Sequence, residues 1–239
     1  MTPSPHTLGT IAELWRYPIK SLGGERLERC SLDLRGLCGD RSWAIVGNDG
    51  KIGSGKTTKR FRRMSGLLDL SASSQKDDVP LISFPDGIRA RGDHPSTPVR
   101  ISELLGEEVS LRQEAEVSHH DDSPVHIITT GSLAWLQSRH PEVAIDARRF
   151  RPNIVIQTSE PWEEESWTRH AIRLGDAVLR PFKVTERCVM ITMAQPGITF
   201  SPRLLGDLER QHDGSFGIYA QVVTPGELRL GDSIELIDD

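Results

Sequence analysis

Residues 173–184 (RLGDAVLRPFKV) and residues 229–237 (RLGDSIELI) repeat one short pattern, in which Arg-Leu-Gly-Asp precedes an apolar segment. Glycine and aspartate are typical turn residues, so the simplest interpretation is that both copies are turns that lead into strands. Apolar segments bounded by turn residues recur along most of the chain. Regular strands with glycine-rich corners fit a closed barrel better than an open sheet.

The same texture predicts the other elements. Asn-Asp-Gly at 48–50 and Pro-Asp-Gly at 85–87 are hairpin signals. Helical patterns are rare, and we expect helices only at residues 131–139, with Thr130 as the N-cap, and at 202–211. The predicted fold class is mainly β with some α (α+β): a β-barrel preceded by an N-terminal β module. The predicted strands are residues 9–17, 25–34, 41–47, 81–84, 88–91, 109–113, 153–157, 177–184, 218–223 and 233–237.

The segment between about residues 114 and 124 is rich in charge and poor in apolar side chains, which is typical of a linker. We therefore expect two modules, at residues 8–115 and 122–238. The segment contains His119-His120-Asp121-Asp122, which superficially resembles a metal cluster. Because exposed linkers are often rich in such residues, we interpret it as linker composition.

The bulk composition excludes several classes of protein. With 239 residues, 36% of them hydrophobic and 26% charged, the chain has an ordinary globular composition. Its net charge of −5 argues against a nucleic-acid footprint. It has no run of 18 apolar residues, and its first ten residues, MTPSPHTLGT, lack the features of a secretion signal. We expect a cytoplasmic protein with no membrane or nucleic-acid partner.

Residues 50–57 (GKIGSGKT) match the nucleotide-binding pattern G-x-x-x-x-G-K-[ST]. In a true P-loop, a helix follows and points its N-terminus at the phosphates. Here β-branched and basic residues follow and βαβ alternation is absent, so we interpret the stretch as a glycine-rich hairpin entering a basic strand. The basic run itself is either a solvated face or a phosphate-binding rim, and the sequence leaves both open. Its members are Lys56, Lys59, Arg60, Arg62 and Arg63.

The three cysteines, Cys30, Cys38 and Cys188, are scattered and form no C-x-x-C pair. This spacing excludes a disulfide framework and a zinc or iron–sulfur site. A lone cysteine is usually a small buried hydrophobe, and we interpret Cys30 and Cys38 in this way. Cys188 instead follows a polar Thr-Glu-Arg run at 185–187, and the adjacent Arg187 favours the thiolate, the form that binds metals. Cys188 is therefore the candidate metal ligand.

Four separated stretches resemble those of MOSC-domain proteins, the family that includes the C-terminal region of molybdenum cofactor sulfurase and the amidoxime-reducing molybdoenzymes. The resemblance covers nearly the whole chain in order, up to Phe216-Gly217 and Leu230-Gly231-Asp232. It implies a MOSC β-barrel fold at 122–238, preceded by a MOSC N-terminal β-barrel-like region at 8–115. The four stretches are Tyr17-Pro18-Ile19-Lys20-Ser21, Gly39-Asp40-Arg41-Ser42-Trp43, Phe150-Arg151-Pro152-Asn153-Ile154-Val155 and Thr185-Glu186-Arg187-Cys188.

Carried over position by position, the resemblance implies a molybdenum–molybdopterin cofactor held by distant parts of the chain. Cys188 supplies a thiolate to molybdenum beside the two sulfurs of the pterin dithiolene. Lys20 and Arg41 meet the phosphate or the pterin edge, and Ser21 donates a hydrogen bond. The other implied cofactor contacts are Ser123, Arg151, Asn153 and Thr185.

The resemblance also implies a molybdenum-dependent reductase that takes oxygen from N-hydroxylated or N-oxygenated small molecules. The chain shows no iron–sulfur domain and no membrane anchor, so we expect separate electron-transfer proteins as partners. The acidic run Trp162–Trp167 is interpreted as a surface turn, or alternatively as a docking site for an electron donor. Two other functions stay open: a sulfur carrier with a persulfide on Cys188, and a non-catalytic carrier of the cofactor.

Overall fold

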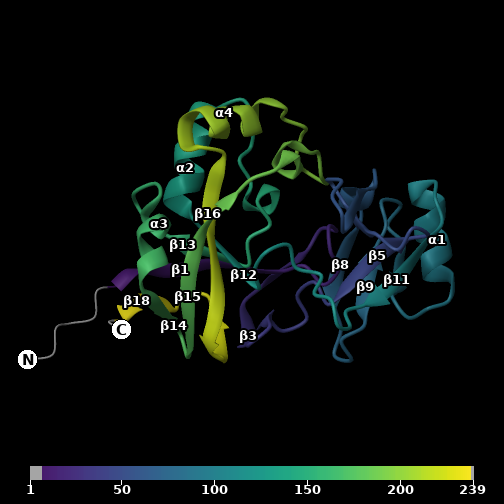
Figure 1. The fold of residues 1–239 in the computed structure, drawn as a ribbon, viewed down its shortest axis with the longest axis horizontal. Coiled ribbons are helices and arrows are strands. Elements are labelled where there is room, and N and C mark those ends of the chain that lie inside the picture. Colours follow the sequence, from purple (N-terminus) through teal and green to yellow (C-terminus); the bar gives the residue numbers. More distant parts are fainter. Residues whose placement is uncertain (1–6, 238–239) are drawn as a thin grey trace, which may run out of the picture.

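Seven strands form a closed barrel in the computed structural model, which describes residues 7–237 (Figure 1). Around the ring they are β13 (Ile154–Gln157), β12 (Val125–Thr129), β16 (Ser215–Thr224), β15 (Ala177–Glu186), β14 (Ala171–Leu174), β18 (Ser233–Ile237) and β1 (Thr7–Arg16). The ring closes because β1 also pairs antiparallel with β13, with Leu14 opposite Ile154. The predicted fold class and barrel are thus confirmed. Residues 1–6, where the sequence predicts no targeting signal, and residues 238–239, which include the predicted end of the second module, lie outside the described residues.

The barrel interior is filled by branched apolar side chains, as alternation along the strands requires. Leu14, Ile127, Ile154 and Ile218 are all fully buried in this core. A separate apolar cluster packs the helices against the barrel, centred on the stacked rings of Phe150 and Phe216 at 4.0 Å between centroids. The helices on this side are α2 (Thr130–Arg139), α3 (Glu163–Ser166) and α4 (Arg203–His212), beside the 3-10 helices Ala147–Arg149, Trp167–Arg169 and Val189–Thr192.

Two small sheets and the helix α1 lie beside the barrel, on the right in Figure 1. Their own apolar core includes Ile19, Ile45, Leu70 and Ile82. One sheet has the order β11-β5-β6-β7 and another β10-β9-β8, while β3 pairs with β4 and β17, and β2 extends the barrel sheet at β1. The bounds are β2 (Glu25–Leu27), β3 (Arg29–Asp33), β4 (Gly36–Leu37), β5 (Trp43–Gly47), β6 (Ile52–Ser54), β7 (Phe61–Arg63), β8 (Ser71–Ser74), β9 (Pro80–Ser83), β10 (Arg89–Arg91), α1 (Ser96–Leu105), β11 (Val109–Gln113), β17 (Gly226–Arg229) and the 3-10 helix Leu67–Asp69.

The two Arg-Leu-Gly-Asp copies are turns, as predicted: one joins β14 to β15 and the other joins β17 to β18. Gly175 and Gly231 have φ of +51° and +86°, a conformation that favours glycine. The two turns also meet, because a Cβ at Gly175 would lie 2.5 Å from a carboxylate oxygen of Asp232. The two copies of the repeat therefore form adjacent turns at the same edge of the barrel.

Other local predictions are corrected in detail. The predicted strand 25–34 is two strands, because β2 pairs with β1 whereas β3 pairs with β17. The N-cap of α2 is Thr129, not Thr130, and its hydroxyl accepts from the backbone N–H of Ser132. The sequence does not predict the helices α1 and α3 or the strands β4, β8, β12, β14 and β17. No helix of residues 7–237 is long and apolar enough to cross a bilayer.

The P-loop-like residues 50–57 contain the strand β6 and the turn after it, and the next element is the strand β7. No helix follows to direct its N-terminus at a phosphate. The hairpin is the antiparallel pair β5–β6, whose turn contains Gly50, whereas β6 and β7 pair in parallel, so the hairpin interpretation is correct only for the start of this stretch.

Candidate functional site

A cavity of about 90 Å³ lies where the barrel and the N-terminal sheets meet, and it gathers residues from both. Seven of the eight site residues predicted from sequence line it: Lys20, Ser21, Arg41, Ser123, Arg151, Asn153 and Cys188. The eighth, Thr185, is fully buried and is not among the lining residues. The other lining residues are Lys56, Asp121, His126, Arg149, Phe150, Glu186, Arg187, Met190 and Tyr219.

Three of these predicted residues have unusual backbone conformations. Ser21, Arg41 and Arg151 have φ of +67°, +51° and +54°, in the left-handed region that non-glycine residues seldom adopt. Each such residue costs of order 1 kcal/mol or more and persists only where its surroundings impose it, most often at functional sites. The strain therefore marks this cavity as a site independently of any sequence resemblance.

Two guanidinium groups stack on the buried ring of Tyr17. The carbon centre of Arg151 lies 4.2 Å from the ring centroid and that of Arg41 lies 4.9 Å away. Arg41 is paired with the buried carboxylate of Asp40 and donates to the carbonyl of Arg151 at 3.1 Å. Tyr17 itself is fixed, because its backbone N–H donates to Asp40 at 2.7 Å. This arrangement holds two cations side by side in a buried place.

Asn153 connects the strands around the cavity. Its carbonyl oxygen accepts from the backbone N–H of His126 at 3.1 Å and from Arg41 at 3.5 Å, and its amide donates to the carbonyl of Trp15 at 3.4 Å. Ser123 is similarly engaged, since its hydroxyl donates to the carbonyl of Ala220 at 2.9 Å. Both side chains line the cavity and also hold its wall together.

Cys188 is half-buried. It lies just after the end of β15 and directly before the 3-10 helix Val189–Thr192. The neighbouring Arg187 donates to the carbonyl of Phe150 at 2.8 Å and faces Nε2 of His126 at 3.3 Å. Burial, together with Arg187, holds the pKa of His126 well below its ordinary value, so His126 is neutral and leaves the charge to Arg187. The thiol therefore lies beside a fixed positive charge, as its sequence context predicts.

Cys30 and Cys38 have different surroundings. Cys30 is buried in the barrel core, and burial raises the pKa of its thiol to about 12. Burial also raises the pKa of Cys38, and the nearby Asp33 adds to the effect. Neither thiol lines the cavity. The interpretation as a small buried hydrophobe is confirmed for Cys30, whereas Cys38 is only half-buried and lies beside the carboxylate of Asp33.

Several donors around the cavity lack a hydrogen-bond partner within the described part of the chain. They are the Ser21 hydroxyl, Nη2 of Arg151, Nε of Arg187 and, behind the wall, the Thr185 hydroxyl. A buried unpartnered donor costs about 1–3 kcal/mol, and more when it is charged. Because all of these groups can donate, the cavity is prepared for a ligand that accepts hydrogen bonds.

The charges that line the cavity point the same way. Burial and, to a smaller extent, the nearby Arg41 lower the pKa of Arg151 to about 10. Burial lowers the pKa of Lys20 to about 8, although Asp121 acts in the opposite direction. Six basic side chains line the cavity against two acidic ones, Asp121 and Glu186. The surplus of positive charge favours an anionic ligand.

The lowered pKa of Lys20 predicts a pH dependence of stability. The unfolded chain keeps its lysine protonated up to about pH 10.5, whereas the folded protein releases this proton near pH 8, so Lys20 makes the free energy of unfolding rise between these values. Each pKa unit corresponds to about 1.4 kcal/mol. We expect chemical denaturation of cofactor-free protein to show this rise in the wild type relative to Lys20→Met. Parallel curves for the two proteins from pH 8 to 10.5 would contradict the assignment.

The basic run divides into separate roles. Lys56 is the member of the run that lines the cavity, so it is the one placed where a phosphate-binding rim would be. Arg62 pairs with Glu107, and Arg60 donates to the carbonyl of Ser118. Lys59 is exposed and, like the other members except Lys56, is not among the lining residues.

Two polar segments that the sequence predicts to be exposed to solvent contain buried side chains. His119 and His120, expected in an exposed linker, are each only 6% exposed, and burial lowers the pKa of both. Glu164, expected on an acidic surface turn, is fully buried and accepts from Thr129 and Ser132, each at 2.8 Å. Among residues 7–237 no group of three or more His, Cys, Asp or Glu side chains is arranged so that it could hold a metal ion.

Sequence reasoning also missed lining residues. His126 and Tyr219 lie on β12 and β16, inside apolar strand patterns that give no sign of a site, and Asp121 was assigned to the linker. Arg149 uses its guanidinium to hold the loop after Cys188, donating to the carbonyls of Ile191 and Thr199 at 3.2 and 2.8 Å. Only its position beside the Phe150–Val155 stretch signalled such a role.

Comparison with protein families gives two matches along the chain. The family described as MOSC domain matches residues 114–235, and the family described as MOSC N-terminal beta barrel domain matches residues 8–120. Together they account for nearly all of the described residues.

Curated relatives extend over most of the chain. Mitochondrial amidoxime-reducing component 1 of Homo sapiens is 26% identical over 290 residues, covering 96% of this chain and 83% of the human protein. Mitochondrial amidoxime reducing component 2 of Bos taurus is also 26% identical, over 95% of this chain. Molybdenum cofactor sulfurase of Oryza sativa subsp. japonica is 22% identical over 75% of this chain but only 28% of the plant protein.

Solved structures support the fold. The YUAD protein from Bacillus subtilis superposes with a TM-score of 0.52 at 14% identity, covering 95% of this chain and 94% of that protein. A second crystal structure, of a hypothetical protein, gives a TM-score of 0.51 at 10% identity over 98% of this chain. At such low identity the likeness concerns the fold alone.

Proposed function

Because this chain belongs to the MOSC domain family, we propose that it binds a molybdenum–pterin cofactor with Cys188 as the metal ligand and reduces N-hydroxylated or N-oxygenated small molecules. Relatives named as amidoxime-reducing components and as molybdenum cofactor sulfurases support a function that depends on this cofactor. The expected cytoplasmic location and the two-module division at residues 8–115 and 122–238 stay predictions.

The observation that carries the proposal is the set of unpartnered donors around a cavity that also exposes a thiol. Ser21, Arg151 and Arg187 line a cavity with surplus positive charge and each has a buried donor without a partner, and Cys188 lines the same cavity. A phosphorylated pterin is an anion with many acceptor atoms, and a molybdenum–dithiolene centre takes a soft thiolate as a further ligand. The residues present therefore fit this cofactor.

When bound, the cofactor supplies two-electron oxygen-atom transfer, and the protein supplies binding, orientation and electrostatics. Lys20, Arg41 and Arg151 hold the negative charge of the cofactor. The guanidinium of Arg187, which donates to the carbonyl of Phe150, places a positive charge next to Cys188. Arg149 keeps the loop that follows the cysteine in place.

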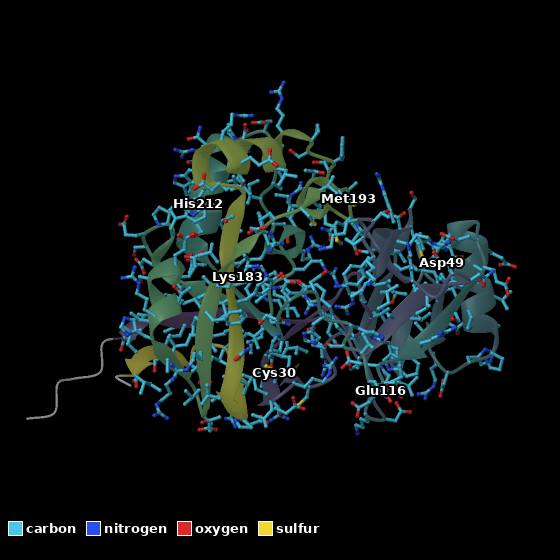
Figure 2. The ribbon with its side chains drawn as sticks, viewed as in Figure 1. Cys30, Asp49, Glu116, Lys183, Met193 and His212 are labelled. Carbon is cyan, nitrogen blue, oxygen red and sulfur yellow. The ribbon has the colours of Figure 1, made fainter. Side chains whose placement is uncertain are left out.

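A second cavity, of about 290 Å³, is our proposed entrance for the small-molecule substrate. It shares Ser21 with the first cavity and is lined by Met64, Leu67, Met193 and Phe200. Figure 2 shows Met193 where the segment after Cys188 approaches the N-terminal sheets. Arg63 and Asp69 also line this cavity, so it suits a compound with an apolar body and a polar N–O group that it carries toward the first cavity. We further propose that a separate electron-transfer protein supplies the electrons.

The test is to express the protein in a host that makes the cofactor. We expect stoichiometric molybdenum, the fluorescence of oxidised pterin after acid release, and reduction of benzamidoxime when a reduced viologen dye supplies electrons. Cofactor without turnover, but with transfer to an apo-enzyme, would instead identify a carrier. A persulfide on Cys188 without pterin, seen by mass spectrometry, would identify a sulfur carrier.

A further inference from the structure

Asp121 lies at the wall of the cofactor cavity and binds two lysines at once. Its carboxylate accepts from Nζ of Lys20 at 2.5 Å and pairs with Nζ of Lys56 at 3.2 Å. Lys20 is nearly completely buried, whereas Lys56 and Asp121 are about one-third exposed. Burial acts to raise the pKa of Asp121, but Lys20 and Lys56 outweigh it and hold that pKa below its usual range. The carboxylate is therefore ionised at neutral pH.

The two ammonium groups are held in place by more than Asp121. Both lie against the ring of Phe61, with Nζ of Lys20 at 4.8 Å and Nζ of Lys56 at 5.6 Å from its centroid. A cation over an aromatic face gains about 0.5–2 kcal/mol. The pair of lysines thus keeps its position on Phe61, and it presents two cations to whatever anion lies between them.

Two converging ammonium groups are also what a phosphate group requires, because its oxygens accept several charge-assisted hydrogen bonds. A phosphate dianion and a carboxylate repel each other when they share the same two cations. Binding of a phosphate therefore favours a state in which Asp121 has left Lys20 and Lys56. The partial exposure of Asp121 gives its side chain a path into solvent.

We propose that Asp121 is an internal counter-anion of the phosphate subsite, which neutralises Lys20 and Lys56 while no phosphate is bound and is displaced by the phosphate of an incoming ligand. The inference rests on the proposed function only for the identity of the larger ligand. A tethered carboxylate competes at high effective concentration, so free phosphate binds weakly. A phosphorylated pterin overcomes the competition because Arg151, Arg187 and Ser21 add contacts that free phosphate lacks. Asp121 thereby makes the subsite selective for a phosphate carried by a larger molecule.

The experiment measures binding of inorganic phosphate to full-length, cofactor-free protein by isothermal titration calorimetry. We expect Asp121→Asn to bind phosphate about tenfold or more tightly than the wild type, because the competing anion is gone, and Asp121→Glu to resemble the wild type. If Asp121→Asn does not fold, as judged by circular dichroism, Asp121→Ser makes the same test with a smaller side chain.

Asp122→Asn is the matched control. Asp122 is the adjacent residue, is mostly exposed, and pairs with Lys183 at 3.6 Å outside the cavity. Its substitution removes the same charge, so it reports any general effect of net charge, and we expect less than a twofold change in phosphate affinity.

Three results would overturn the inference: unchanged or weaker phosphate binding in Asp121→Asn, equal gains in both aspartate variants, or no phosphate binding in any of them. Each is independent of molybdenum content. The outcome for Asp121 is therefore separable from that for the proposed reductase, which depends on Cys188.

Discussion

Replacing Cys188 by serine is expected to bring molybdenum-dependent reduction of an N-hydroxylated substrate close to background. Loss of an outer partner of a metal ligand typically costs 10–100-fold in affinity or activity, and loss of the ligand itself should exceed this. The thiolate is the soft ligand that the metal requires, and a serine hydroxyl is neither soft nor ionised at neutral pH. The measurements are molybdenum content per chain and the rate of benzamidoxime reduction.

The folding of this variant should be nearly unchanged. Cys188 is half-buried, and the structure gives its side chain no hydrogen bond as a helix cap. Cys38→Ser is the matched control, because Cys38 is also half-buried but lies outside the cavity, near Asp33 at 3.7 Å. We expect this control to retain both molybdenum and activity. Full activity in Cys188→Ser would remove the thiolate from the proposed chemistry.

Local sequence signals predicted the parts of the fold that local chemistry determines. The hairpin glycines Gly50 and Gly87 have φ of +76° and +84°, as turns that need a left-handed residue require. The strands at 109–113 and 233–237 have the predicted bounds. The choice of strands that close the barrel had no such local signal, because β1 pairs with β13 and β18, which lie more than a hundred residues later in the chain. Pairing at that separation depends on the complete set of strands.

The candidate site also contains residues that the sequence predicts and residues that it does not. The stretches that hold Lys20, Arg41, Arg151 and Cys188 were found from resemblance, and the structure brings these residues into one cavity. Composition alone misplaced Asp121, because a charged segment resembles a solvated linker when its lysine partners lie 65 and 101 residues away. Burial of a charge is decided by such distant partners and leaves no mark in the local sequence.

Sequence equally cannot say which member of a basic run faces a site. Lys56 lines the cavity, whereas Arg62 pairs with Glu107 and Asp49. Lys56 lies in the turn after β6 and Arg62 lies in β7, and these local structures set the direction of each side chain. The strained backbone of Ser21 and Arg151 is likewise visible only in three dimensions, although it is the clearest structural sign of function.

Replacing Arg151 by methionine is expected to lower cofactor occupancy more than tenfold without lowering the stability of the cofactor-free protein. The guanidinium is desolvated beside Arg41 and has an unpartnered Nη2, and within residues 7–237 it donates to the carbonyl of Leu22 at 2.6 Å. Losing that bond costs about 1 kcal/mol, and removing a buried, incompletely compensated cation offsets the loss. Methionine keeps an apolar contact with the ring of Tyr17. Unlike glycine, it does not relieve the strained backbone conformation at this position, so the substitution tests the guanidinium alone.

The measurements are pterin fluorescence per chain and the free energy of unfolding from urea denaturation. Arg62→Met is the control with the opposite pattern, because Arg62 pairs with Glu107 and Asp49 outside the cavity. We expect it to keep full occupancy and to lose up to about 1 kcal/mol of stability, as surface ion pairs do. If Arg151→Met instead destabilised the protein by several kcal/mol and kept its pterin, the guanidinium would be structural. The expected result would mean that the buried Arg151 guanidinium lowers the free energy of unfolding of the cofactor-free protein, and that its role is to bind the anionic ligand.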